Sequence, residues 1–193
     1  MAVDRSIDRS LLHFPEEVKR RFTFLAASGF RDVHAEPTLV RYESQPMIIN
    51  VFHGRRSYEI GLEIESREVP AESHTMSEIL RLVDAERADN YRNFAAHTVE
   101  GVAQGVQQLA VLFQKCIEAG IFNDEHFFPR LKVQRSTLTN DYWFKMNFKQ
   151  AHYEAESAWS KKDFGKVVQI LSPLQEHLNP SDLKKLDYAK NHL

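Results

Sequence analysis

The chain has 193 residues, of which 42% are hydrophobic, and its 25 basic and 27 acidic side chains give a formal net charge of -2. This composition is typical of a globular protein and argues against a disordered chain. The near balance of charge, without a long basic run, argues against a dedicated nucleic-acid binder.

The cysteine content and the apolar segments indicate a compartment. Cys116 is the only cysteine, so the chain can form neither an internal disulfide nor a cysteine-based zinc site. The N-terminal sequence MAVDRSIDRSLLHF lacks the uninterrupted apolar stretch of a secretory signal. No segment approaches the roughly 20 apolar residues of a membrane span. We therefore expect a cytoplasmic protein that does not cross a membrane.

The first part of the chain predicts one helix and three strands. A proline at the first position and Gly29 after the last position delimit a helix over residues 15–28. Residues 38–44 and 57–65 alternate between polar and apolar side chains, and 47–53 is a nearly continuous apolar run. The connections are too short for crossover helices, so we expect an antiparallel meander with one face packed on the helix.

The pattern then changes to a helical period. A loop through residues 69–70 leads to Thr75–Glu78, which matches a capping box and predicts the start of a helix. A long helix is expected over residues 90–119, with Gly120 as its stop. The spacing of Gly101 and Gly105 predicts that another helix packs closely there, and a break near Gly101 is the alternative.

The last part predicts helical hairpins. Helices are expected over residues 140–160, 163–178 and 180–192, with Asp163 and Asn179 as N-caps. The predicted fold class is α+β: an N-terminal helix on a three-stranded antiparallel meander, followed by an all-helical half. We expect the units to comprise residues 1–88 and 89–193 and to pack together as one body.

Two segments carry a resemblance to known families. The apolar signature of residues 148–180 resembles one tetratricopeptide-type helix pair, which implies helical-hairpin packing. Residues 14–83, with the segments VRYES, MIINVFHG and RRSYEIGLEIE, resemble small bacterial proteins of the immunity or defence-associated kind. That resemblance implies binding to a toxin or another protein, without a cofactor. The residues that carry the helix-pair signature are Ala155, Trp159, Phe164, Val168, Leu171 and Pro180.

A search for catalytic motifs finds none. The glycine-rich phosphate loops and the G-x-S-x-G nucleophile elbow are absent. His152 and Glu156 share a helix face, and residues 124–126 join two acids to a histidine, but two ligands do not define a metal site. We therefore expect no catalytic residue, no metal and no cofactor.

The candidate interaction residues lie in the predicted hairpin and in the segment after the capped helix. Arg55, Arg56 and Tyr58 offer forked hydrogen bonds and rigid apolar area to a partner. Tyr58 shares the strand parity of Ile60, which favours a place in the core. At least one member of the aromatic triplet 142–144 should be partly exposed or cover a neighbouring element, because three adjacent residues cannot all face one side of a helix.

Further candidates are the strand residues Glu59 and Glu63 and the segment with Tyr91 and Arg92. Glu59, Glu63 and Glu65 share one strand face, which is either a solvated or partner-facing surface or a place where neighbouring acids raise one another's pKa. For Tyr91 and Arg92 the alternative is packing between the two halves. The preferred function is a non-enzymatic protein-interaction module. The alternative is a small hydrolase or transferase that combines Glu59 or Glu63 with a distant histidine.

Overall fold

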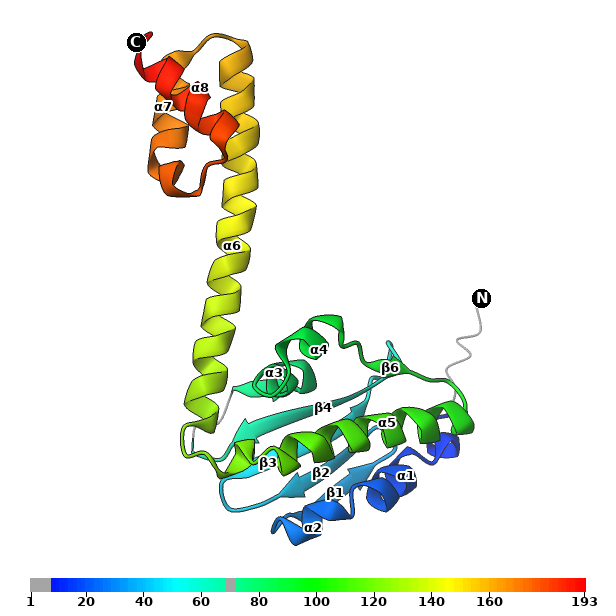
Figure 1. Cartoon of the computed structure of the whole chain (residues 1–193). Helices are drawn as coiled ribbons and strands as arrows, with labels where there is room; N and C mark the ends of the chain where they lie inside the picture. Colours follow the sequence, from blue (N-terminus) through cyan, green and yellow to red (C-terminus); the bar gives the residue numbers. More distant parts are fainter. Residues whose placement is uncertain (1–7, 69–71) are drawn as a thin grey trace, which may run out of the picture. The chain divides into compact units, whose positions relative to one another are not determined.

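The structure of the chain is a computed structural model that describes residues 8–68 and 72–193 (Figure 1). The expected loop at residues 69–70 and the start of the N-terminal sequence lie outside the described residues. The chain divides into two compact units, one up to Gln134 and one from Arg135 onward. This division differs from the expected boundary after residue 88, because the long helix that follows packs on the sheet of the first unit.

The first unit has an α+β fold with a six-stranded antiparallel sheet. The strand order is β1-β2-β3-β4-β5, and β6 pairs with the other end of β4. Its elements in chain order are a 3-10 helix (Arg9–Leu12), α1 (Phe14–Arg21), α2 (Phe24–Ala27), β1 (Arg31–Glu36), β2 (Leu39–Glu43), β3 (Met47–His53), β4 (Glu59–Ser66), β5 (Ser73–Thr75), α3 (Met76–Arg81), α4 (Ala85–Asn90), β6 (Phe94–Ala95), α5 (Val99–Glu118), a 3-10 turn (Ile121–Asn123) and the start of α6 (Phe127–Ser160).

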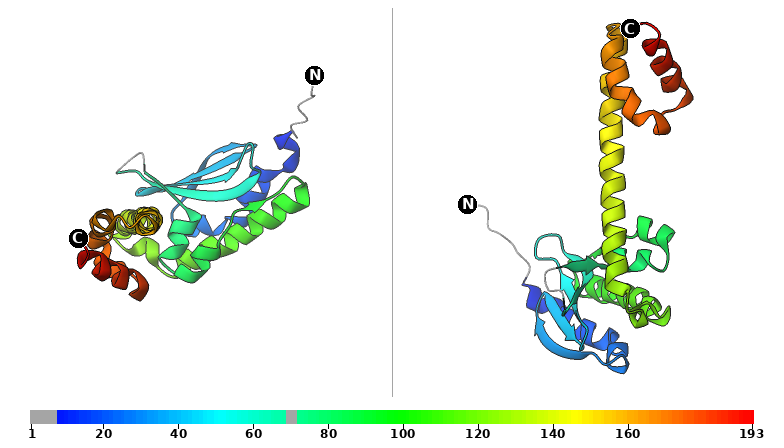
Figure 2. Two further views of the ribbon diagram at one scale, coloured as in Figure 1. Left: turned by 90° about the horizontal axis from the view of Figure 1, so that it is seen from above. Right: turned by 90° about the vertical axis from the view of Figure 1, so that its left-hand side faces the viewer.

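The core of this unit lies on one face of the sheet. Helices α1 and α5 pack against each other and against that face (Figures 1 and 2). The antiparallel meander of β2, β3 and β4 that the sequence predicts is confirmed. Alternate residues of these strands are buried beneath the helices, as the period of two requires. The buried strand residues of this face are Val40, Tyr42, Ile49, Val51, Ile60, Leu62 and Ile64.

Three further strands extend the meander beyond the prediction. All six residues of β1 are exposed, and the alternation of Val33 and Ala35 with polar residues is too short to predict a strand by itself. As an edge strand, β1 contains Asp32 and His34 and a break in register between them, features that discourage pairing with another chain. Strands β5 and β6 have three and two residues, which is too short for a period to be recognised.

Two of the predicted helices are shorter or divided. The expected helix over residues 15–28 ends at Arg21 and resumes as α2 at Phe24, although Gly29 has the expected left-handed conformation with a φ of 80°. The helix predicted over residues 90–119 begins later in the structure. The first residues of that range form the end of α4 and strand β6. Helix α5 begins after Thr98, whose side chain accepts a hydrogen bond from the amide of Gly101.

The prediction that a helix packs at Gly105 is wrong. A methyl group at Gly105 would lie 2.6 Å from Phe94 Cδ1 and 2.7 Å from Ile60 Cδ1, so α5 approaches two strands closely at this point. The capping box at the start of α3 is confirmed, since the amide of Thr75 donates to Glu78 Oε2 over 2.8 Å. Gly120 ends α5 with a φ of 75°, also as expected.

The second unit is helical. It contains the greater part of α6, then α7 (Phe164–Leu171), a 3-10 turn (Ser172–His177) and α8 (Pro180–Lys190). Asp163 and Asn179 are N-caps, as predicted. The expected helix over 163–178 becomes 3-10 from Ser172 onward, where Pro173 has no amide hydrogen to donate. Its core consists of Ala155, Ala158, Val167, Leu171, Leu186 and Ala189.

Candidate interaction surfaces

The first candidate surface is the turn between β3 and β4. The side chains of Arg55 and Arg56 are exposed there, whereas Tyr58 is half-buried. The expected strand parity of Tyr58 is wrong because β4 begins at Glu59, and Tyr58 has a left-handed φ of 57°. Its ring therefore does not enter the sheet core.

Arg9, in the N-terminal 3-10 helix, binds this turn. Its guanidinium donates to the carbonyl oxygens of Gly54 and Arg55 over 2.8 and 2.7 Å. Its Cζ atom also lies 3.7 Å from the centre of the Tyr58 ring, in cation–π geometry. On the other side, the ring of His97 is 4.1 Å from that of Tyr58 between centroids. The turn is thus fixed by a residue that the sequence analysis did not single out.

His53 lies beneath the same turn. It is buried, with Nε2 3.0 Å from the carbonyl oxygen of Ala96 and Nδ1 3.0 Å from Arg9 NH1. Since the carbonyl can only accept, Nε2 carries the hydrogen, and Nδ1 accepts from Arg9. Burial lowers the pKa of His53 below its usual value, against the raising effect of the hydrogen bond to Ala96. The histidine is therefore a neutral structural link.

The second candidate surface is the sheet face opposite α1 and α5. Glu63 lies in a cross-strand row with Asn50 and Thr75, and Glu59 is exposed at the start of β4 next to Ala95. The remaining acid, Glu65, accepts a hydrogen bond from Asn50 Nδ2 over 2.9 Å. The acids are therefore spread along an open strand face.

Neighbouring groups on this face also bind one another. Arg41 Nε donates to Asn50 Oδ1 over 2.9 Å, which links three strands through Asn50 to Glu65. The arrangement supplies a polar surface without enclosing a substrate.

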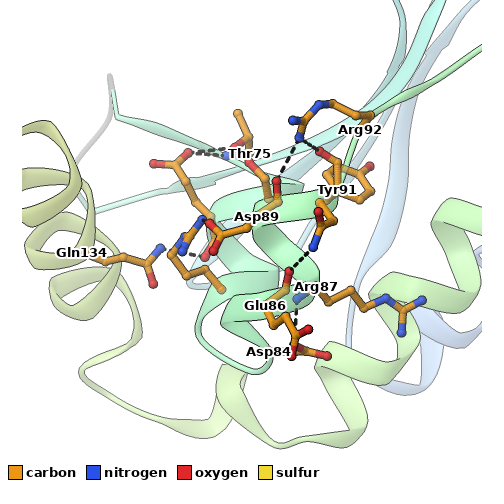
Figure 3. A network of polar contacts seen from close by, with 12 residues as sticks. Thr75, Asp84, Glu86, Arg87, Asp89, Tyr91, Arg92 and Gln134 are labelled. Carbon is orange, nitrogen blue, oxygen red and sulfur yellow. Dashed lines mark hydrogen bonds and ion pairs between the residues drawn. The ribbon is translucent and has the colours of Figure 1, made fainter. Parts of the chain in front are cut away.

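The third candidate, the segment after α4, lies within the first unit (Figure 3). Arg92 NH1 donates to the backbone oxygens of Asp89 and Tyr91, and Tyr91 Oη donates to Asn93 Oδ1 over 3.0 Å. An ion pair between Arg81 and Asp89 joins α3 to α4. Burial raises the pKa of Tyr91 to about 12, so this phenol stays neutral. Tyr91 and Arg92 flank a cavity against α5.

The fourth candidate surface is a row of exposed apolar side chains on α6 in the second unit. Tyr142, Met146 and Tyr153 are 59%, 48% and 73% exposed, and Leu138 is 40% exposed. At about 100° per residue, these four side chains lie within about 80° of one another around the helix axis. We call them the α6 stripe. Ala155 and Ala158, which pack on α7 and α8, lie on roughly the opposite side of the helix.

The aromatic triplet of α6 divides between two sides, as predicted. Tyr142 belongs to the stripe, and Trp143 is 58% exposed beside it. Phe144 turns toward the core side, where its ring lies 4.6 Å from that of His177 between centroids. The helix is thus apolar on two sides, one of which packs within the unit and one of which is open. Sequence reasoning found the exposed aromatics but not the stripe.

An ionic cluster fastens α8 to α6. His152 and Glu156, which the sequence paired, are joined by the buried Asp182, and ligand atoms of the three residues lie within 4.8 Å of one another. His152 Nδ1 is 3.1 Å from Asp182 Oδ2, to which Asn179 Nδ2 donates over 2.7 Å. The Lys185 ammonium binds Glu156 and lies 3.8 Å from Asp182 Oδ1. Lys185 thus places a positive charge beside the carboxylates of Glu156 and Asp182.

Within the described residues, no helix combines the length and the apolar character needed to cross a bilayer. Comparison of the chain with protein-family models, with curated proteins and with solved structures gave no significant match.

Proposed function

We propose that the chain is a non-enzymatic protein-interaction module that binds its partner through the α6 stripe. The carrying observation is that Leu138, Tyr142 and Met146 form an exposed apolar row with a spacing of four residues. Such a row is the pattern by which an amphipathic helix docks into an apolar groove. Tyrosine and tryptophan are enriched among the residues that contribute most to binding, and Trp143 flanks this row.

The charge beside the stripe defines the complementary groove. Between residues 136 and 150 the helix carries Lys145 and Lys149 and one acid, Asp141. Lys149 lies within the angular range of the stripe, so a groove with an apolar floor and an acidic rim is complementary to it. Burial of this surface also removes apolar area from water, which favours association.

The partner class and the compartment form part of the same proposal. The resemblance of residues 14–83 to bacterial immunity-type proteins supports a protein toxin as the first partner to test. A cytoplasmic location is supported by Cys116, which is buried and unpaired. The small net charge supports a protein partner over a nucleic acid.

The test is affinity capture of the tagged chain from its native cells, with Tyr142→Ser/Met146→Ser as the stripe variant. Val33→Ser is the matched control, because Val33 is an exposed apolar residue of β1. Arg55→Ala/Arg56→Ala tests the β3–β4 turn in parallel. The proposal expects one stoichiometric protein that the stripe variant loses and both other variants retain. Recovery of no specific protein, or loss only in the turn variant, contradicts it.

A further inference from the structure

A cavity of about 490 Å³ lies between the α4–β6 segment and α5, entirely within the first unit. This volume is within the range of roughly 300–1,000 Å³ found for small-molecule sites. Ile60, Phe94 and Leu109 contribute apolar walls, and Gly105 allows the close approach of the strands at one side. The cavity therefore offers an apolar surface to a compact ligand.

The charged residues that line the cavity are both basic. Arg87 and Arg92 contribute to its lining, and no lining residue is acidic. Arg92 donates only to backbone carbonyls among the described residues, so no carboxylate neutralises it. The guanidinium of Arg87 has no hydrogen bond or ion pair to any described residue, and it extends away from the polar network of α4 in Figure 3. Two uncompensated cations thus border an apolar space.

Gln107 also lines the cavity, from α5. Its Oε1 atom has no hydrogen-bond partner among the described residues, but that atom is shielded from solvent and is not exposed to the cavity. The phenol of Tyr91 donates to Asn93. The positive charge of the two arginines is therefore the polar feature of the lining that selects a ligand.

We propose that this cavity binds a small organic anion that has an apolar body and one acidic group. The apolar body packs against Ile60, Phe94 and Leu109, and the acidic group binds the guanidinium of Arg87, with Arg92 adding positive charge. This site is independent of the α6 stripe, which lies in the other unit.

Two fluorescent probes with the same aromatic body test the proposal. 8-Anilino-1-naphthalenesulfonate carries an acidic group and an N–H, whereas N-phenyl-1-naphthylamine carries the N–H but no acidic group. The full chain should bind the sulfonate about tenfold more tightly than the amine, as expected for a charge-assisted contact. Arg87→Gln/Arg92→Gln should abolish that preference and leave the affinity for the amine unchanged.

Matched variants separate the cavity from general effects. Arg55→Gln/Arg56→Gln removes the same two charges from an exposed turn of the same unit. The stripe variant Tyr142→Ser/Met146→Ser removes exposed apolar surface that could also bind the dye. Retention of the preference in both variants supports the proposal. Equal affinity of the two probes for the unaltered chain overturns it, as does an equal loss in the two arginine pairs or a loss in the stripe variant.

Discussion

Arg9 lies over the ring of Tyr58 and at the same time donates to two backbone oxygens of the β3–β4 turn. One side chain thereby holds a left-handed residue in place and attaches the N-terminal 3-10 helix to the sheet. Hydrogen bonds from a charged donor contribute about 1.5–3 kcal/mol each, and the contributions are not additive. The conformation of the turn therefore depends on a residue more than 40 positions away.

Arg9→Met should lower the free energy of unfolding by about 2 kcal/mol, because it removes both charged donors and the cation–π contact. Urea unfolding followed by circular dichroism measures the change. Arg55→Met is the matched control, since the exposed Arg55 side chain should contribute less than about 0.5 kcal/mol. Equal losses in the two variants would show that the contacts of Arg9 with the turn and with Tyr58 add no stability.

His53 should make the first unit less stable in mild acid. Burial lowers the pKa of His53 in the folded state, so below the unfolded value of about 6.5 the unfolded chain binds the proton more readily. The stability that this neutral histidine contributes is present above pH 6.5 and is lost as the pH falls through the lower, folded pKa.

The measurement is urea unfolding at pH 7.5 and at pH 5.5, in the original chain and in His53→Gln. Glutamine can still donate to Ala96 and accept from Arg9, but it does not titrate. We expect a smaller loss of stability between the two pH values in the variant. His126→Gln is the control because His126 is exposed. An unchanged loss in His53→Gln would assign the acid sensitivity to other groups.

The two glycines of α5 should respond differently to alanine. At Gly105 the new methyl would overlap Phe94 and Ile60, so Gly105→Ala should cost about 1–2 kcal/mol in spite of its better helix propensity. At Gly101 the nearest atoms are at 3.1 and 3.2 Å, and the gain in propensity should offset the crowding. Thermal unfolding of both variants measures the difference. A larger loss at Gly101 would contradict the packing described for α5.

The ionic cluster of the second unit predicts that substitution of Lys185 lowers the free energy of unfolding more than substitution of the neighbouring Lys184. Lys185→Met leaves the buried Asp182 with fewer positive partners and should cost about 2 kcal/mol. Lys184→Met is the control, because Lys184 is exposed on the same helix. Urea unfolding compares the two. Similar values would mean that the Lys185 ion pairs do not contribute to the attachment of α8 to α6.

The elements that the sequence predicted correctly are those with a local signal. The meander of β2 to β4 follows from alternation in Thr38–Ser44 and Ser57–Glu65, and the caps at Thr75, Asp163 and Asn179 follow from short-range hydrogen-bond chemistry. Strand β1 could not be found in this way. Its alternation covers only Val33 and Ala35, and its side chains are all exposed, so pairing with β2 is what identifies it as a strand.

The residues that the sequence missed act through contacts between distant segments. Arg9 reaches the β3–β4 turn, Asp182 joins His152 and Glu156 from α8, and Gln107 lines a cavity formed with α4 and β6. Neither composition nor spacing encodes such contacts. That at least one aromatic residue of 142–144 is partly exposed or covers a neighbouring element was predictable, because the angular spacing of a helix cannot place three adjacent residues on one face.

The most direct test of the interaction surface is a binding titration of the captured protein against the original chain and against Tyr142→Ser/Met146→Ser. Truncation of a dominant interface residue typically costs at least about 2 kcal/mol, which corresponds to a roughly thirtyfold weaker affinity. We predict a loss of at least this size in the stripe variant and an unchanged affinity in Val33→Ser. An affinity that is the same in all three chains would contradict binding through α6.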